Sequence, residues 1–360
     1  MILIDRRIAQ IQQRNSPGRR RGRHPNNCGL SHTHTSSSFS KMAARIPHSL
    51  SYFDPATRRW VAVLSKTIQR PGAQSLVKTK PIKHIFDIVS WNVDFWNNQA
   101  HRRCLGLIDH VLERGAPDIL CLQEVRSDVR DSLLGNRTIR EAFLTTDADV
   151  GLACEDDKPF TTMTLLSNKR FAYSLDSKEA VGGSEGGCKF IVGPVSREPL
   201  PSASGRDGLY VDIIPPFAPD TFLRIINAHL DSRNRFSYRA QQLKHLARVL
   251  REPGCSGGVI VGDFNAVTDE DDKLIEENEL EDAWLALHGD TDPDAPTWSV
   301  GRRREAEFEP RRLDKVAMVG LTAETMEIMH PGFIDVPKPG GTSDQIEWSD
   351  HSGLRCRFAY

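Results

Sequence analysis

The sequence predicts an α/β or α+β fold in which β-sheets pack face to face and helices cover their outer sides. From Ile85 to the C-terminus, apolar segments of strand length interleave with amphipathic segments of helix length. Layered folds are built from this order of elements. Most of the apolar segments are followed directly by a polar group, and the chain contains no internal repeat.

Strands are expected where short runs of apolar and β-branched residues occur. These runs are Ile88–Asn92, Ile119–Leu122, Thr161–Leu166, Leu209–Ile213, Phe222–Ile226, Gly258–Val261, Lys315–Val319 and Gly353–Phe358. The glycine-rich stretch from Gly182 to Gly208 is expected to be a loop.

Two helices are expected from apolar residues at helical spacing. The first runs from His101 to Glu113, ends before Gly115, and places on one face Leu105, Ile108, Val111 and Leu112. The second runs from about Ser237 to Arg251 and buries Leu243, Leu246 and Leu250.

The chain divides by composition into three parts. Residues 1–45 carry nine Lys and Arg against one acid, Asp5, and have no hydrophobic periodicity, so we expect a disordered basic tail. The composition of this tail is typical of a mitochondrial presequence, of a nuclear-targeting patch or of a solvated tail without a function of its own. Met42 could also be the true translation start. We expect residues 46–82 to form a hairpin-like lead-in and a linker, and residues 83–360 to form the main folded domain, in which any catalytic site would lie.

Composition also limits the partners and the compartment. The basic tail leaves a net charge of −9 on the rest of the chain, which argues against non-specific coating of nucleic acid. No segment approaches the roughly 20 uninterrupted apolar residues of a membrane helix, so no span is expected. Cys104, Cys121 and Cys356 lie in apolar runs without CxxC spacing, as in reduced intracellular proteins. Nucleus, mitochondrion and cytoplasm all stay open, and we expect a monomer.

Polar side chains stand at one end of six of the predicted strands. They include Asn92, Glu124, His229, Asp263 and Asp314, and His351 stands just before the last strand. Taken alone, each of these residues could equally be an ordinary turn residue or a solvated strand end without a function. Together they supply what is needed to hold Mg²⁺ on a phosphate, because this ion prefers a few carboxylates combined with waters and phosphate oxygens. Glu124, helped by Asp350 or Asn92, is the expected metal-binding group.

The segment Gly262-Asp263-Phe264-Asn265 follows the buried run Val259-Ile-Val261. In an extended chain, residues two apart point to the same side. Asp263 can therefore take a proton from water while Asn265 holds an attacking or phosphoryl oxygen. The ordinary alternative is an Asx turn that closes a strand.

Ser349-Asp350-His351 precedes the final strand. His351 can donate to a phosphate oxygen and, when protonated, offset charge in the transition state. Asp314 lies before an apolar strand, where an unpaired carboxylate would be costly, so it is the expected partner of His351. His229 would be a second imidazole that faces the phosphate. A surface turn is the alternative for the Ser349–His351 segment.

These segments, in this order, resemble the endonuclease/exonuclease/phosphatase superfamily from about Asp87 to the C-terminus. The resemblance implies a four-layer sandwich with two mixed β-sheets inside and helices outside. It also implies one Mg²⁺, with Mn²⁺ as a substitute, and in-line attack of water on a phosphoester. Glu124 and Asp350 would then bind the metal. The catalytic residues would be Asn92, His229, Asp263, Asn265, Asp314 and His351.

Within the superfamily, several segments are similar to the 5′-tyrosyl-DNA phosphodiesterase branch. They include Thr161–Lys169, His229–Arg233 and Leu280–Trp284. This likeness implies that Ser232 and Arg233 touch the scissile phosphate and that Trp298 stacks on a ring in the substrate groove. The chain departs from the branch at Phe264, where Thr is usual, and at Ala266-Val267, where an Arg is usual.

The substrate implied by this branch is a 5′-phosphotyrosyl or related adduct at a DNA end, which is a DNA-repair function. Another nuclease, a deadenylase or a phosphatase of the same superfamily would use the same residues. A catalytically inactive nucleic-acid-binding module is the alternative of a different class. Loss of one of the strand-end residues would favour the inactive module, and all of them are present.

Overall fold

The computed structural model describes residues 44–63, 84–149, 158–173, 189–216, 218–289, 295–300 and 309–360. The chain separates into two compact units, Met1–Met42 and Ala43–Tyr360. The first unit lies outside the described residues, so the expectation of a disordered tail stays a prediction. The second unit contains all the elements described below. None of its helices in the described ranges combines the length and apolarity that a membrane crossing needs.

Two eight-stranded sheets form the centre of the described part of this unit. The first has the order β1-β9-β10-β11-β12-β14-β13, with β8 beside β9. Its strands are β1 (Ile46–His48), β8 (Phe171–Ala172), β9 (Phe190–Pro199), β10 (Asp207–Ile214), β11 (Phe222–His229), β12 (Cys255–Asp263), β13 (Glu281–Asp282) and β14 (Asp314–Val319).

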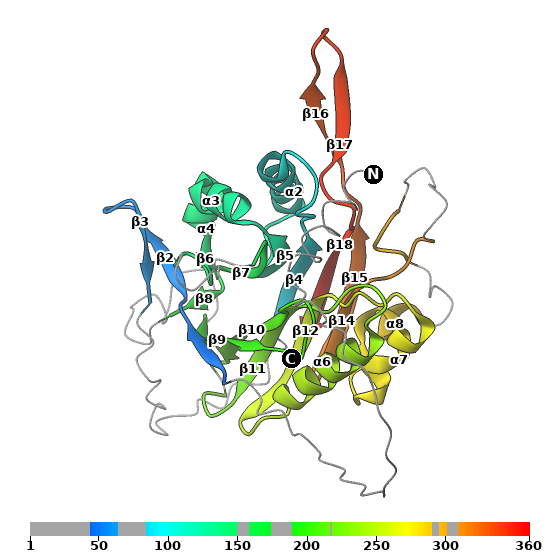
Figure 1. Cartoon of the computed structure of the whole chain (residues 1–360). Helices are drawn as coiled ribbons and strands as arrows, with labels where there is room; N and C mark the ends of the chain where they lie inside the picture. Colours follow the sequence, from blue (N-terminus) through cyan, green and yellow to red (C-terminus); the bar gives the residue numbers. More distant parts are fainter. Residues whose placement is uncertain are drawn as a thin grey trace, which may run out of the picture. The chain divides into compact units, whose positions relative to one another are not determined.

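The second sheet has the order β15-β18-β4-β5-β7-β6-β2-β3. Its strands are β2 (Ser51–Asp54), β3 (Arg59–Ala62), β4 (Ile85–Asn92), β5 (Ile119–Val125), β6 (Phe143–Thr145), β7 (Thr161–Ser167), β15 (Thr322–Met329) and β18 (Gly353–Ala359). A separate hairpin of β16 (Phe333–Pro337) and β17 (Ser343–Glu347) extends away from the sheets (Figure 1).

The main core lies between the two sheets. One cluster of buried side chains combines Ile88 and Ile119 of the second sheet with Val211, Ile225 and Val259 of the first. Residues from facing sheets that share one cluster show that the sheets pack face to face. The expected four-layer sandwich with mixed sheets is therefore confirmed.

Helices cover both outer faces. On the second sheet lie α2 (Ala100–Glu113), α3 (Ser127–Gly135) and α4 (Arg137–Ala142), and on the first lie α6 (Phe236–Val249) and α7 (Asp269–Glu277). A short helix, α8 (Ala283–His288), packs near β14 and β15. Figure 1 shows the α2–α4 group and the α6–α7 group on opposite sides of the strands.

Two expectations need correction. The loop expected from Gly182 to Gly208 contains the ten-residue strand β9 and the start of β10, while residues 182–188 lie outside the described ranges. Gly193 and Pro194 hid this strand, because they fall at a β-bulge in its pairing with β10. The buried face of α2 also includes Cys104 and Leu107, whereas Leu105 and Leu112 are only partly buried.

Strand pairing gathers the polar strand ends at one edge. In the first sheet, β11 runs parallel to β12 and pairs His229 with Asp263, which pairs in turn with Asp314 of antiparallel β14. In the second sheet, β4 runs parallel to β5 and pairs Asn92 with Gln123, next to Glu124. The edge where these strands end is thus set by the topology of each sheet.

A buried polar bridge joins the two sheets directly beneath this edge. Gln123 donates through Nε2 to Oδ1 of Asn227 over 2.9 Å, and Asn227 donates back to the carbonyl oxygen of Leu122 over 3.2 Å. Both amides are fully buried, so their hydrogen bonds fix how the two sheets face each other. Gly262 leaves room beside this bridge, because a Cβ there would lie 3.2 Å from Gln123 Nε2 and 1.9 Å from the carbonyl oxygen of Ala228 on the neighbouring strand, and its φ is +141°.

Candidate active site

His351 and Asp314 form a buried pair. His351 Nδ1 lies 2.8 Å from Asp314 Oδ2, and its Nε2 lies 3.8 Å from Asp263 Oδ2. Burial alone would lower the pKa of His351, but the two carboxylates raise it well above its ordinary value. The two carboxylates therefore favour the charged form of the ring, in which Nδ1–H is directed to Asp314 and Nε2–H toward Asp263.

Asp263 lies between donors from both sheets. Its Oδ2 accepts from Asn92 Nδ2 over 3.0 Å, and its Oδ1 accepts from the backbone amide of Asn265 over 2.8 Å. Burial raises the pKa of Asp263 to about 6, even though the charge of His351 opposes the shift. At neutral pH the group is an oriented carboxylate whose basicity is suited to accepting a proton from water.

Asn265 has a side-chain contact that its sequence position did not reveal. Its Nδ2 donates to the carbonyl oxygen of Leu230 over 3.0 Å, and its backbone φ is +48°. A non-glycine residue in this conformation is held there by its surroundings. Asn265 therefore ties the turn after β12 to the end of β11, and its side-chain oxygen is left for other contacts.

His229 is present as one defined tautomer. Its Nδ1 lies 3.1 Å from Nη1 of Arg206, which can only donate, so Nδ1 accepts and Nε2 carries the proton. Nε2 lies 3.3 Å from Asp263 Oδ2 and 3.9 Å from Glu124 Oε1. Burial, with the positive charges of Arg206 and His351, lowers the pKa of His229 well below its ordinary value. The site thus combines an imidazole held in its neutral form, His229, with one whose charged form is favoured, His351.

Glu124 lies at the end of β5 with φ +60° and accepts a hydrogen bond at Oε2 from the amide of Phe95 over 3.0 Å. The pKa of this carboxyl group is raised to about 7, mainly by burial and in part by the nearby charges of Asp350 and Asp263. A carboxylate that is crowded by other carboxylates favours a cation beside it.

Asp350 is held by Trp298, whose indole Nε1–H donates to Asp350 Oδ2 over 3.1 Å. The backbone amide of Ser299 also donates to the Asp350 carbonyl over 3.2 Å. Trp298, predicted to stack on the substrate, thus has a hydrogen-bonding role at the predicted metal ligand. Its part in stacking stays a prediction.

The donor set suits a hard divalent cation. Asp263, Asp314 and His351 offer ligand atoms within 4.8 Å of one another, but Asp314 is hydrogen-bonded to His351, Asp263 accepts from Asn92 and Asn265, and the carboxylates favour the protonated form of His351. Glu124 and Asp350 are both carboxylates, and Asp350 is close enough to Glu124 to raise its pKa. Oxygen ligands of this kind are preferred by Mg²⁺ and Mn²⁺, so the Glu124–Asp350 side of the site fits the ion better.

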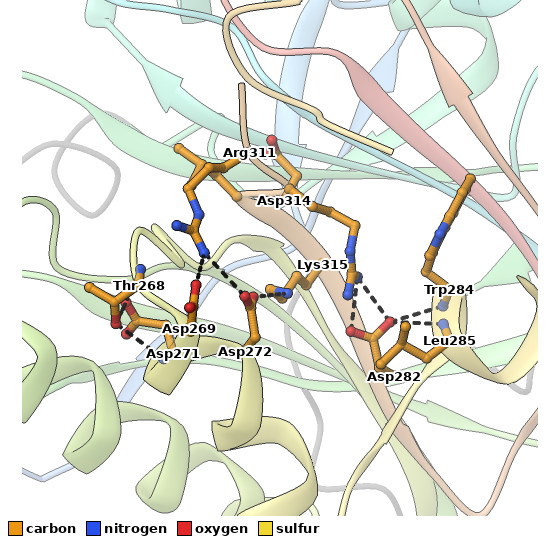
Figure 2. Close-up of polar contacts among 12 residues, drawn as sticks. Thr268, Asp269, Asp271, Asp272, Asp282, Trp284, Leu285, Arg311, Asp314 and Lys315 are labelled. Atoms are coloured by element: carbon orange, nitrogen blue, oxygen red, sulfur yellow. Dashed lines mark hydrogen bonds and ion pairs between the residues drawn. The ribbon is translucent and has the colours of Figure 1, made fainter. Parts of the chain in front are cut away.

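The segment that carries Asp314 is fixed by ion pairs below the site. Arg311 Nη2 lies 2.8 Å from Asp269 Oδ1, and Lys315 Nζ lies 2.8 Å from Asp272 Oδ1 (Figure 2). Thr297, which is fully buried, accepts at Oγ1 from the amide of Asp314 over 2.9 Å. These contacts position the carboxylate that holds His351.

The structure does not connect Ser232 and Arg233 to the other predicted catalytic residues by hydrogen bonds among the described residues. They follow His229 at the same strand end, Arg233 is exposed with φ +65°, and among the described residues no hydrogen bond joins either to the catalytic cluster. Buried Arg239 donates to the carbonyl oxygens of Asp231 and Arg233 over 3.0 and 2.7 Å and fixes their turn. Their contact with substrate stays a prediction.

Two groups at the site, Arg206 and Asp94, were missed from the sequence, and Ser349 was recognised only as part of the Ser349–His351 segment, without a role. Arg206 lies in the stretch expected to be a loop and has no local signal. Ser349 donates to the carbonyl oxygen of Asn92 over 2.5 Å and accepts from the amide of His351 over 3.0 Å. Asp94, buried with φ +55°, could have been suspected from its place two residues after Asn92.

Two face-to-face sheets thus meet at a cluster of carboxylates, amides and histidines, an arrangement suited to phosphoester hydrolysis. A sequence model of the endonuclease/exonuclease/phosphatase family matches residues 89–351. This match spans most of the chain and includes every strand-end residue described above. The chain belongs to this family.

Solved structures agree with this fold. TDP2 from D. rerio, crystallised with a single-stranded DNA product, superposes with a TM-score of 0.54 at 19% identity, covering 76% of this chain and 98% of that one. Truncated TDP2 from Caenorhabditis elegans gives 0.54 at 18%, covering 77% and 98%. A family protein from Bacteroides thetaiotaomicron gives 0.53 at 11%, covering 78% and 99%. A search of curated proteins found no match.

Proposed function

We propose that this chain is a Mg²⁺-dependent phosphodiesterase that hydrolyses a phosphoester at a nucleic-acid end by in-line attack of water. The observation that carries the proposal is the arrangement around Asp263. A protonated His351, a neutral His229 and the amide of Asn92 all face one carboxylate oxygen. This set combines a proton acceptor with donors for a charged phosphoryl group.

Asp263 is the proposed base. With a pKa of about 6 it is ionised at neutral pH and can still accept a proton from a bound water. Asn92 and the Asn265 amide hold its two oxygens, so the accepting lone pair has a fixed direction. Fixed geometry of this kind lowers the entropic part of the barrier.

His351 is the proposed stabiliser of the transition state. Asp314 holds its ring through Nδ1, which leaves the charged Nε2–H for a non-bridging phosphate oxygen. His229 presents a second N–H without adding a charge. Mg²⁺ held by Glu124 and Asp350 would polarise a phosphate oxygen and offset its negative charge. Mn²⁺ would fit the same oxygen ligands.

The proposed substrate is a 5′-phosphotyrosyl or related adduct on a DNA end. The similar segments His229–Arg233 and Thr161–Lys169 support it, as does the DNA product reported with the D. rerio TDP2 neighbour. Because that neighbour is only 19% identical, the superposition itself shows the common fold, and the shared substrate is part of this proposal. Another nuclease, a deadenylase or a phosphatase remains the second candidate, and an inactive binding module the third.

The organisation of the chain belongs to the same proposal. Residues 83–360 would be the catalytic domain, residues 46–82 a lead-in and linker, and residues 1–45 a basic tail for targeting or a solvated extension. The structure adds that β1, β2 and β3, all within residues 46–62, pair with strands of the two sheets. We propose a monomer that acts inside the cell, with the nucleus, the mitochondrion and the cytoplasm as candidate compartments.

The test is cleavage of a substrate panel with Mg²⁺. The panel holds a 5′-phosphotyrosyl oligonucleotide, an abasic duplex, an unmodified single strand, poly(A) and a phosphoinositide. Selective release of tyrosine by the wild type, and not by Asp263→Asn, would support the adduct as substrate. Cleavage of a different member would keep the mechanism and replace the substrate. Silence on every member would favour the binding module.

A further inference from the structure

Trp96 is the most exposed large apolar side chain in the described part of the second unit. Its exposed fraction is 61%, against 54% for Phe333 at the start of β16. A large aromatic ring in water contributes little to folding, and exposed aromatic surface beside a polar site commonly marks a contact with a ligand. Trp96 lies four residues after Asn92 and two after Asp94, so it stands beside the catalytic cluster.

The loop that carries Trp96 is held in place. The amide of Trp96 donates to Asp94 Oδ1 over 3.0 Å. Arg103, which is fully buried, donates to the carbonyl oxygens of Asp94, Asn97 and Asn98 over 2.6, 3.2 and 3.0 Å. One guanidinium group thus fixes the backbone on both sides of Trp96. The indole is presented by an ordered loop, which lowers the entropy lost when a ligand binds.

Neighbouring rings connect Trp96 to the active site. The ring centroid of Trp96 lies 4.4 Å from that of Phe95, Phe95 lies 4.3 Å from Phe160, and Phe160 lies 5.6 Å from His229. The amide of Phe95 also donates to Glu124. A continuous row of rings therefore begins at His229 and ends at the exposed face of Trp96.

Positive charge accompanies this row. Arg126 Nη1 donates to the carbonyl oxygen of Phe95 over 3.2 Å, and its guanidinium group is partly exposed. The guanidinium carbon of Arg206 lies 5.1 Å from the ring centroid of Phe160. Aromatic rings interleaved with arginines are the means by which proteins hold single-stranded nucleic acid, since bases stack on the rings and phosphates attract the cations.

We propose that Trp96 is a stacking platform for a planar ring that the substrate carries next to its scissile phosphate. The inference rests on the proposed function and adds a residue that selects the substrate. Two parts of the same substrate offer the required chemistry: the terminal nucleobase and an aromatic leaving group. Trp96 acts on binding, so its removal raises KM and leaves kcat near the wild-type value.

The test compares Trp96→Ala with Phe333→Ala, which removes an exposed ring of similar exposure from the β16–β17 hairpin. Three single-stranded substrates are used: a 5′-phosphotyrosyl oligonucleotide, the same strand with an abasic terminal residue, and the same strand with a 5′-alkyl phosphodiester in place of tyrosine. We expect Trp96→Ala to lower kcat/KM about tenfold on the first substrate, the usual effect of losing one stacked ring. Trp96→Phe and Phe333→Ala should each change it by less than about threefold.

The other two substrates identify the ring. If the loss disappears on the abasic strand, Trp96 holds the base, and if it disappears on the alkyl diester, Trp96 holds the leaving group. An equal loss on all three substrates, or no loss on the first, overturns the inference.

Should the wild type cleave none of the three, the proposed function fails and equilibrium binding of an unmodified oligothymidylate replaces kinetics. Weaker binding by Trp96→Ala than by Phe333→Ala then supports the platform, whereas equal or absent binding overturns it.

Discussion

His351 and Asp314 belong to different sheets, and one hydrogen bond of 2.8 Å joins them. Asp314 begins β14 of the first sheet, and His351 precedes β18 of the second. The charge on the imidazole therefore depends on how the two sheets face each other. The Gln123–Asn227 bridge beneath the site fixes this relation. Chemistry and packing are thus coupled at the sheet edge.

Asp314→Asn should lower the pKa of His351 and so favour its neutral form. Burial lowers the pKa of His351, and the two carboxylates raise it above its ordinary value, so loss of Asp314 shifts it downward. We expect kcat to fall by about 10²- to 10⁴-fold. At saturating Mg²⁺ and above pH 7, where Asp263 is ionised, the remaining activity of the variant should decline as pH rises, whereas the wild type should stay level. A mutant profile parallel to that of the wild type would contradict the role of Asp314.

Mg²⁺ dependence should follow the ionisation of Glu124. The pKa of this group is raised to about 7 without the ion, with burial as the main cause, so a proton competes with Mg²⁺ below that pH. We expect the Mg²⁺ concentration for half-maximal activity to rise about fivefold from pH 7 to pH 6, because about half of Glu124 is protonated at pH 7 and most of it at pH 6. EDTA should abolish activity, and Glu124→Gln should remove most of the pH effect. Activity that survives chelation would exclude the metal.

Trp298→Phe keeps an aromatic ring and removes the indole N–H that donates to Asp350. Groups that orient a metal ligand typically contribute 10- to 100-fold to metal affinity. We therefore expect a Mg²⁺ requirement at least about tenfold higher, measured by titration of activity, with kcat recovered at saturating Mg²⁺. An unchanged titration with weaker substrate binding would instead favour the stacking role expected from the sequence.

Asp147 should contribute stability that acid removes. Its carboxylate is fully buried and lies 2.8 Å from Arg197 and 3.2 Å from His48. Burial alone would raise its pKa, but these partners lower it to about 2, below the unfolded value of 3.8. Because the folded-state pKa is depressed, the contribution of about 2 kcal/mol is complete above pH 5 and is lost as pH falls through 2.

The measurement is urea unfolding of the wild type and Asp147→Asn between pH 7 and pH 3. The difference in unfolding free energy should be largest at pH 7 and narrow toward pH 3. A difference that stays constant over this range would show that the carboxylate charge has no part in it.

The strand-end residues can be predicted from the sequence because parallel pairing brings the carboxyl ends of neighbouring strands to the same edge of a sheet. Asn92 and Glu124 close two neighbouring parallel strands, as do His229 and Asp263, so apolar runs with polar ends suffice to place them. Arg206 could not be predicted in this way. It contacts His229 only because β10 and β11 pair at that edge, and its own segment reads as a glycine-rich loop.

The direction of the Trp298 side chain could also not be predicted from the sequence. Trp298 donates to Asp350 because two isolated bridges join it to His351 and Arg311, and no local pattern signals such contacts. Strand β9 was missed because Gly193 and Pro194 interrupt its apolar run at a bulge. The spacing of apolar and polar residues predicts which side chains lie at the same edge of a sheet. The conformations of loops and bulges determine which groups those side chains contact.

The central claim is that Asp263 and its neighbours hydrolyse a phosphodiester with Mg²⁺. Its most direct test is single-turnover cleavage of a 5′-phosphotyrosyl oligonucleotide by the wild type and by Asp263→Asn, with circular dichroism to confirm equal folding. We expect Mg²⁺-dependent release of tyrosine by the wild type and a rate about 10²- to 10⁴-fold lower for the variant. Equal rates for the two folded proteins would contradict the account.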